Sequence, residues 1–151
     1  MKFYCDVMLG RLSKYLRILG MDCVYFKNNL MLREYQGKFD EQSFFLTKKA
    51  GTIKHPHVII VKSDSVKKQL EEIKNLIKPF VHVKTIMSRC ILCNTRLVDI
   101  QKQDVEHVVP EFIFHKYELF RVCPTCKKVY WPGSHIEHMQ KWTGEFLEHV
   151  K

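Results

Sequence analysis

The sequence predicts an α/β protein in two parts, a mostly parallel sheet with covering helices followed by a small ribbon held by four cysteines. Over residues 1–84, short apolar runs alternate with amphipathic segments, which is typical of strands and helices that take turns in a parallel sheet. Beyond residue 84 the alternation stops and two Cys-x-x-Cys pairs begin. We therefore expect one domain over residues 1–84 and a second over residues 85–151.

Four short runs are the expected strands of the first domain. They read "KFYCD", "CVYF", "SFFLT" and "HVIIV", at residues 2–6, 23–26, 43–47 and 57–61. The last two are apolar at nearly every position, as expected for strands that are covered on both faces. Residues 28–42 have only a weak helical pattern, which Gly37 interrupts.

Two segments between these strands are expected to form covering helices. The first carries four leucines at helical spacing and ends at Gly20, while Arg11, Lys14 and Arg17 share its other face. The second, "SDSVKKQLEEIKNLIKP", has capping residues at its start, one apolar stripe and Pro79 at its end. The leucines of the first helix are Leu9, Leu12, Leu16 and Leu19.

The second domain is expected to contain two helices. Pro110 suits the first turn of one, whose apolar contacts come from Phe112, Ile113, Tyr117 and Phe120. A capping box of Ser134 and Glu137 predicts a terminal helix that buries Met139, Trp142 and Phe146. His135 and His138 are interpreted as ordinary residues of that helix.

Composition and charge limit the classes of function. Hydrophobic residues make up 46% and charged residues 27% of the 151 residues, which excludes a wholly disordered chain. The net charge is +9, and residues 1–84 carry +8 of it, with 16 Lys and Arg against 8 Asp and Glu. Such an excess indicates either a nucleic-acid partner or a solvated lysine-rich surface. No uncharged run approaches membrane-spanning length, and Asp6 interrupts any signal peptide, so we expect a cytoplasmic protein without a membrane partner.

The two cysteine pairs predict a zinc ribbon. Cys90 and Cys93 form one pair and Cys123 and Cys126 the other, separated by the 29 residues 94–122. Two such pairs complete a tetrahedral site for Zn²⁺, and because cysteines fill all four positions the ion would be structural. Disulfides or a redox pair are the alternatives, and a reducing compartment disfavours the first. Cys5 and Cys23 are expected to be small core residues.

Two carboxylates follow the expected strands. Asp6 ends the first strand and Asp64 follows the fourth, so both belong to the edge of the sheet where ligands of parallel sheets gather. Together they could hold Mg²⁺ or Mn²⁺ for phosphodiester hydrolysis. The alternative is that Asp64 caps a helix and Asp6 is a loop residue. Asp22 precedes the second strand and is expected at the opposite edge.

Several motifs resemble the C-terminal RNase domain of the mut-seven family. They are "DVMLGRLSKYLRILGMD", "VKSDSVKKQL", "SRCILCNTRL" and "RVCPTCKKVYWPGSHIEHM", which occur in the family's order over nearly the whole chain. The resemblance implies a PIN-like, Rossmann-like nuclease fold fused to a zinc ribbon. It also implies metal-dependent RNA cleavage with Asp6 as a metal ligand.

The chain departs from this family pattern at the expected metal site. Lys49 occupies the position where the resemblance implies a metal-binding aspartate, and Glu34 is the nearest acidic replacement. Two hypotheses follow. The chain is a metal-dependent ribonuclease that uses Asp6, Asp64 and Glu34, with Lys49 on the scissile phosphate, or it is a non-catalytic RNA-binding or adaptor protein that keeps the scaffold.

The expected RNA contacts lie on the first helix. Arg11, Lys14 and Arg17 could line one face of it and bind phosphates. Tyr130 and Trp131 could stack on bases, although aromatic residues beside a ribbon more often form its core.

Overall fold

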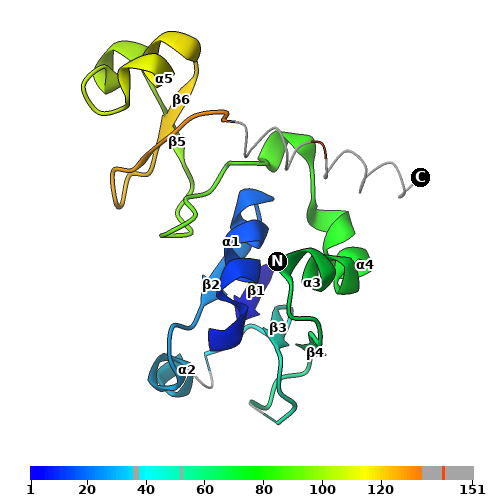
Figure 1. Ribbon diagram of the computed structural model, residues 1–151. Coiled ribbons are helices and arrows are strands. Elements are labelled where there is room, and N and C mark those ends of the chain that lie inside the picture. The colour runs from blue at the N-terminus through cyan, green and yellow to red at the C-terminus, as the bar shows by residue number, and fades with distance from the viewer. Residues whose placement is uncertain (36–37, 52, 134–140, 142–151) are drawn as a thin grey trace.

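A four-stranded parallel sheet forms the centre of the first part of the chain (Figure 1). The computed structural model describes residues 1–35, 38–51, 53–133 and 141. The strands are β1 (Lys2–Cys5), β2 (Asp22–Tyr25), β3 (Phe44–Thr47) and β4 (Val58–Ile60), each within two residues of its expected bounds. Their order is β2-β1-β3-β4, so the chain reverses its direction of winding between β1 and β3.

Three helices cover one face of this sheet, and their apolar stripes share one core with it. They are α1 (Gly10–Ile18), α3 (Val66–Glu72) and α4 (Lys74–Ile77). The helix expected after the fourth strand is divided at buried Ile73, which ends α3 and precedes α4. Ser65 caps α3, since its side chain accepts a hydrogen bond from the Lys68 backbone N–H.

Gly20 ends α1, as the sequence predicts. Its φ is +89°, and the N–H groups of Gly20 and Met21 donate to the carbonyls of Arg17 and Leu16. This pair of hydrogen bonds is the Schellman arrangement, in which glycine supplies the left-handed conformation. A Cβ atom at Gly20 would lie 2.2 Å from the carbonyl oxygen of Thr85, so no side chain fits there.

The other face of the sheet is covered by aromatic residues and by α2 (Asn29–Tyr35). Tyr4, Phe26 and Phe45 are buried, and Tyr35 and Phe39 pack against them. The helical pattern of residues 28–42 is weak because α2 buries only Leu32 and the remaining cover is aromatic. Both faces of the sheet are therefore covered, as its apolar strands predict.

The chain then passes through short 3-10 turns into a second, antiparallel sheet. The turns are η2 (Lys78–Phe80) and η3 (Val83–Thr85), and the sheet has the order β5 (Val98–Ile100), β6 (Phe120–Val122), β7 (Val129–Tyr130). Between β5 and β6 lie η4 (Lys102–Val105) and the expected helix, α5 (Glu111–Lys116). The predicted terminal helix from Ser134 onward falls outside the described residues, apart from Lys141. No helix in the described ranges is long and apolar enough to cross a membrane.

Candidate metal centre and carboxyl edge of the sheet

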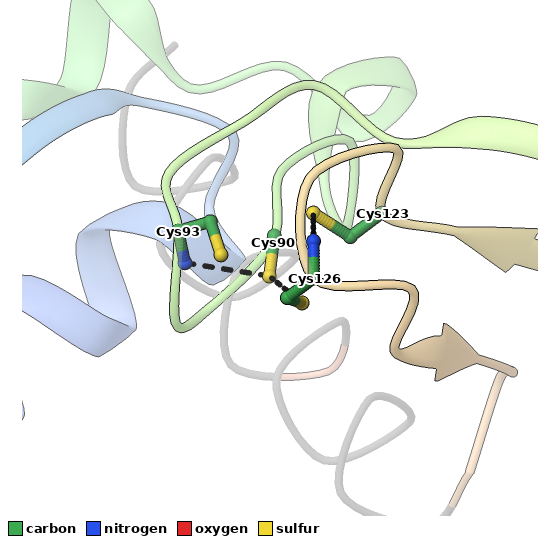
Figure 2. Close-up of side chains that lie close together, drawn as sticks. All are labelled: Cys90, Cys93, Cys123 and Cys126. Carbon is green, nitrogen blue, oxygen red and sulfur yellow. Dashed lines mark hydrogen bonds between the residues drawn. The ribbon is translucent and has the colours of Figure 1, made fainter.

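The four paired cysteines converge on one point, as the sequence predicts. The Sγ atoms of Cys90, Cys93, Cys123 and Cys126 all lie within 4.8 Å of one another, and Figure 2 shows the side chains gathered between two loops. Each pair forms a tight knuckle, in which the N–H of the second cysteine donates to the sulfur of the first, at 3.4 Å for Cys93 and 3.5 Å for Cys126. All four remain free thiols, and none forms a disulfide.

The spacing of the sulfurs fits a tetrahedral metal site. Sulfur atoms at about 2.3 Å from a central ion stand roughly 3.8 Å apart, and Cys90 Sγ lies 3.7 Å from Cys126 Sγ. Burial raises the pKa of Cys123, but backbone N–H groups of Cys126 and Thr125 outweigh this and lower it to about 6. A thiolate is the form that binds a metal, so Cys123 is favoured in its ligand state. The hydrogen bond with Cys126 and burial instead raise the pKa of Cys93.

Tyr130 completes the surroundings of the first cysteine. Its side chain is buried and its hydroxyl oxygen lies 3.1 Å from Cys90 Sγ. The same oxygen accepts the Ile91 backbone N–H at 3.1 Å, which leaves the hydroxyl proton for the sulfur. Burial and the contact with Cys90 raise the pKa of Tyr130, so the hydroxyl stays protonated. Tyr130 therefore belongs to the ribbon interior, and Trp131 packs against the neighbouring apolar cluster.

Asp6 lies at the point where the direction of winding reverses. It follows β1 directly, is buried, and its Oδ2 accepts a hydrogen bond of 2.8 Å from the Thr47 hydroxyl at the end of β3. Its Oδ1 accepts the Val7 N–H at 2.6 Å and caps the short helix η1 (Val7–Leu9). Ligands of open parallel sheets bind in the crevice at this kind of position.

Asp64 is held by a lysine. Its carboxylate is almost fully exposed and forms an ion pair with the ammonium group of Lys48, whose side chain is largely covered. The hydrogen bond and the charge of Lys48 lower the pKa of Asp64. A divalent ion at Asp64 would have to displace this ammonium group.

The three predicted carboxylates, Asp6, Glu34 and Asp64, are not brought together as one group of three. Within the described ranges, the four cysteines are the only set of three or more His, Cys, Asp or Glu side chains close enough to share an ion. Asp6, Glu34 and Asp64 all lie in those ranges, and Glu34 is exposed on α2. Lys49 is exposed, and its backbone N–H donates to the Thr47 hydroxyl oxygen at 3.2 Å.

The expected basic face of α1 is divided. Arg11 and Lys14 are exposed, but Arg17 is buried, and the expectation that it shares their solvent face is wrong. The Arg17 guanidinium donates hydrogen bonds to the carbonyls of Cys23, Ile91 and Leu92. The charge of Arg17 is therefore used for hydrogen bonds inside the protein and is not exposed for contact with RNA.

Four lysines directly follow the strands at the edge that carries Asp6, which we call the carboxyl edge. Lys27 comes two residues after β2, Lys48 and Lys49 follow β3, and Lys62 comes two residues after β4. Three of them are exposed, and Lys48 is half-buried. We did not predict Lys27, Lys48 and Lys62 as site residues, although their positions just after expected strands are visible in the sequence.

An α/β fold with a parallel sheet, followed by a small antiparallel ribbon with four clustered cysteines, is the class that this architecture defines. The family model described as the Mut7-C RNAse domain matches residues 1–143, and the chain belongs to that family. This membership indicates a nuclease-like function related to RNA. No curated protein and no solved structure shows a significant match to the chain.

Proposed function

We propose that the chain binds RNA at the carboxyl edge of its parallel sheet, through lysines that contact phosphates, and that it cleaves RNA only weakly. The family description supports an RNA ligand. The edge lysines and Arg11, in the first turn of α1, supply positive charge around Asp6. Each phosphate that such a side chain neutralises releases condensed counterions, which favours binding.

The ion pair between Lys48 and Asp64 is the observation that carries this proposal. A metal-dependent nuclease needs several carboxylates on one or two ions, and these position water and neutralise the phosphate. Here the Asp64 carboxylate is already paired with the Lys48 ammonium group, and Lys49 is the next residue after Lys48. A cation bound at Asp6 would therefore lack Asp64 as a further ligand for as long as that carboxylate stays paired with Lys48.

We also assign the four-cysteine site to Zn²⁺ with a structural role. Four thiolates at knuckle spacing suit zinc, and no coordination position remains for water or substrate. Removal of the ion is expected to unfold the ribbon, since small ribbons draw much of their stability from the metal.

A slow Mn²⁺-dependent ribonuclease is the second candidate. The position of Asp6 favours it, because a buried carboxylate at the reversal point of the sheet is well placed to hold an ion. In that case Lys49 would contact the scissile phosphate.

Charge reversal at the carboxyl edge tests the proposed binding. A K27E/K62E double variant is compared with K84E/K127E, which reverses two exposed charges in η3 and in the second knuckle. Binding of labelled single-stranded RNA is measured by fluorescence anisotropy at several salt concentrations. We expect K27E/K62E to bind at least about tenfold more weakly at low salt, with a salt slope reduced by about 2, and K84E/K127E to resemble the parent. Equal effects of the two pairs would contradict a binding site at this edge.

A further inference from the structure

The two cysteine knuckles have matching backbones but different surroundings. In each knuckle the N–H of the first cysteine donates to the carbonyl oxygen of the residue five positions on, Cys90 to Thr95 at 2.8 Å and Cys123 to Lys128 at 2.9 Å. The residue after the second cysteine has a positive φ in both, 64° at Asn94 and 66° at Lys127. The side chain of Lys127 is exposed and makes no hydrogen bond to any part of the chain that the structure describes, whereas that of Asn94 contacts the parallel sheet.

Asn94 binds the beginning of the edge strand β2. Its Nδ2 donates to Asp22 Oδ1 at 2.7 Å, and its Oδ1 accepts the Cys23 backbone N–H at 3.1 Å. Asp22 pairs with Lys2 at the amino end of the sheet, opposite to the edge that carries Asp6, as expected. One side chain of the knuckle thus supplies a donor and an acceptor to the end of an edge strand.

Arg17 joins the same strand to the knuckle from α1. Its Nε donates to the Cys23 carbonyl at 2.9 Å, and its Nη1 donates to the carbonyls of Ile91 and Leu92 at 2.7 and 3.2 Å. Ile91 and Leu92 are the residues between the two cysteines of the first knuckle. Four thiolates around a divalent ion carry a net charge of about −2, which the positive charge of a buried arginine beside the knuckle helps to balance.

The segment before the knuckle also packs on α1. The Met87 N–H donates to the Ile18 carbonyl at 2.7 Å, and Thr85 lies against Gly20 so closely that a Cβ there would not fit. Figure 1 shows the antiparallel sheet with β5 and β6 beyond the C-terminal end of α1, which is the end that makes these contacts. The approach of the knuckle to the sheet is therefore fixed at several points.

We infer that the first knuckle is a structural part of the parallel-sheet domain, so that metal binding by the cysteines and folding of α1 and β2 stabilise each other. The boundary at residue 84 then marks a change of pattern in the sequence, but the parts on either side of it do not unfold independently. Because coupling between two equilibria is reciprocal, removal of the metal loosens α1 and β2, and a change on the sheet side weakens metal binding.

Hydrogen exchange of the full chain tests the first direction of this coupling. Exchange is followed by mass spectrometry for the zinc-loaded protein and after zinc removal with a chelator. We expect faster exchange in residues 10–25 as well as in the two knuckles once zinc is removed. Exchange in residues 10–25 that does not depend on zinc, while the knuckles lose protection, would overturn the inference.

Matched glycine variants test the reverse direction. N94G and K127G keep the positive φ of each knuckle, but only N94G removes contacts to the sheet, and D22A removes one of them from the sheet side. Zinc affinity is measured by competition with a coloured chelator. We expect it to fall about tenfold in N94G and to fall in D22A, with K127G close to the parent. Equal losses in N94G and K127G, or unchanged affinity in N94G and D22A, would overturn the inference.

Discussion

Tyr130 shows how a single hydroxyl can adjust a metal site. It donates to the Cys90 sulfur and accepts the Ile91 N–H, so it both withdraws charge from a ligand and fixes the knuckle backbone. Partners of this kind that contact a ligand typically change metal affinity by about 10-fold to 100-fold when they are removed. The effect should appear in zinc affinity even where the fold is intact.

We therefore predict that Y130F binds zinc about tenfold more weakly than the parent chain, because the thiolate loses a donor and the Ile91 N–H loses its acceptor. Competition with a coloured chelator measures this. Y117F is the control, since Tyr117 packs in the ribbon core and its hydroxyl makes no hydrogen bond among the described residues. Equal zinc affinities for Y130F and Y117F would contradict the role of the hydroxyl.

In the proposed function, Lys49 and Asp6 determine how well the carboxyl edge can hold a divalent ion. Replacing Lys49 by Asp exchanges a repelling charge for a potential ligand, so we predict that K49D gains Mn²⁺-dependent RNA cleavage by about tenfold or more. D6N should remove whatever cleavage the parent has, because the buried carboxylate is lost. The parent, K49D and D6N are assayed together on single-stranded RNA with and without Mn²⁺. No gain in K49D would mean that a missing carboxylate does not limit cleavage, and cleavage that persists in D6N would point to another site.

At the scale of elements, the end of α1 is a turn that only glycine fits. Gly20 has a left-handed φ and no room for a Cβ, whereas Gly51 has a similar φ of +78° and nothing within 4 Å of a Cβ. Alanine at Gly51 therefore reports backbone strain alone, whereas alanine at Gly20 reports backbone strain together with a steric clash. G51A is expected to lose about 1 kcal/mol of unfolding free energy through strain alone.

We predict that G20A loses at least about 2 kcal/mol more than G51A, because the Thr85 backbone has to move away from α1. Urea unfolding of both variants measures the difference. If the two variants are equally stable, the contact between α1 and the segment before the knuckle is not tight in solution.

The elements that depend on local pattern could be predicted from the sequence. Alternation predicts the four strands, leucine spacing predicts α1, and Cys-x-x-Cys spacing predicts the convergence of the cysteines. The inward role of Arg17 could not be predicted, because its partners Ile91 and Leu92 lie more than 70 residues away in the chain. Contacts of such separation leave no periodic signal, and α1 alone gives Arg17 the spacing of a solvent-facing residue.

The candidate site could be predicted only in part, because strand ends are visible in the sequence and contacts between side chains from different strands are not. Strand ends indicate which residues share an edge, so Asp6 and Asp64 could be assigned to the carboxyl edge. The pairing of Lys48 with Asp64 depends on side-chain positions across the strand order, which the sequence does not state. That pairing turns a predicted metal ligand into half of an ion pair.

At the scale of the whole molecule, the two edges of the parallel sheet have separate roles in this account. Asp22 at the amino edge and Arg17 on α1 contact the first knuckle. The carboxyl edge holds Asp6 and the lysines that follow the strands. Residues 1–84 also carry +8 of the net charge of +9. The structural metal is therefore expected at one edge and the RNA at the other.

The most direct test of this account measures RNA binding and RNA cleavage in the same sample. Zinc-loaded full-length chain is mixed with labelled single-stranded RNA without added divalent ions and with Mn²⁺, and both anisotropy and the length of the RNA are followed. We predict equal affinity in the two conditions, a steep dependence on salt, and RNA that stays largely intact. Binding that requires Mn²⁺, or rapid Mn²⁺-dependent cleavage that D6N abolishes, would contradict the account.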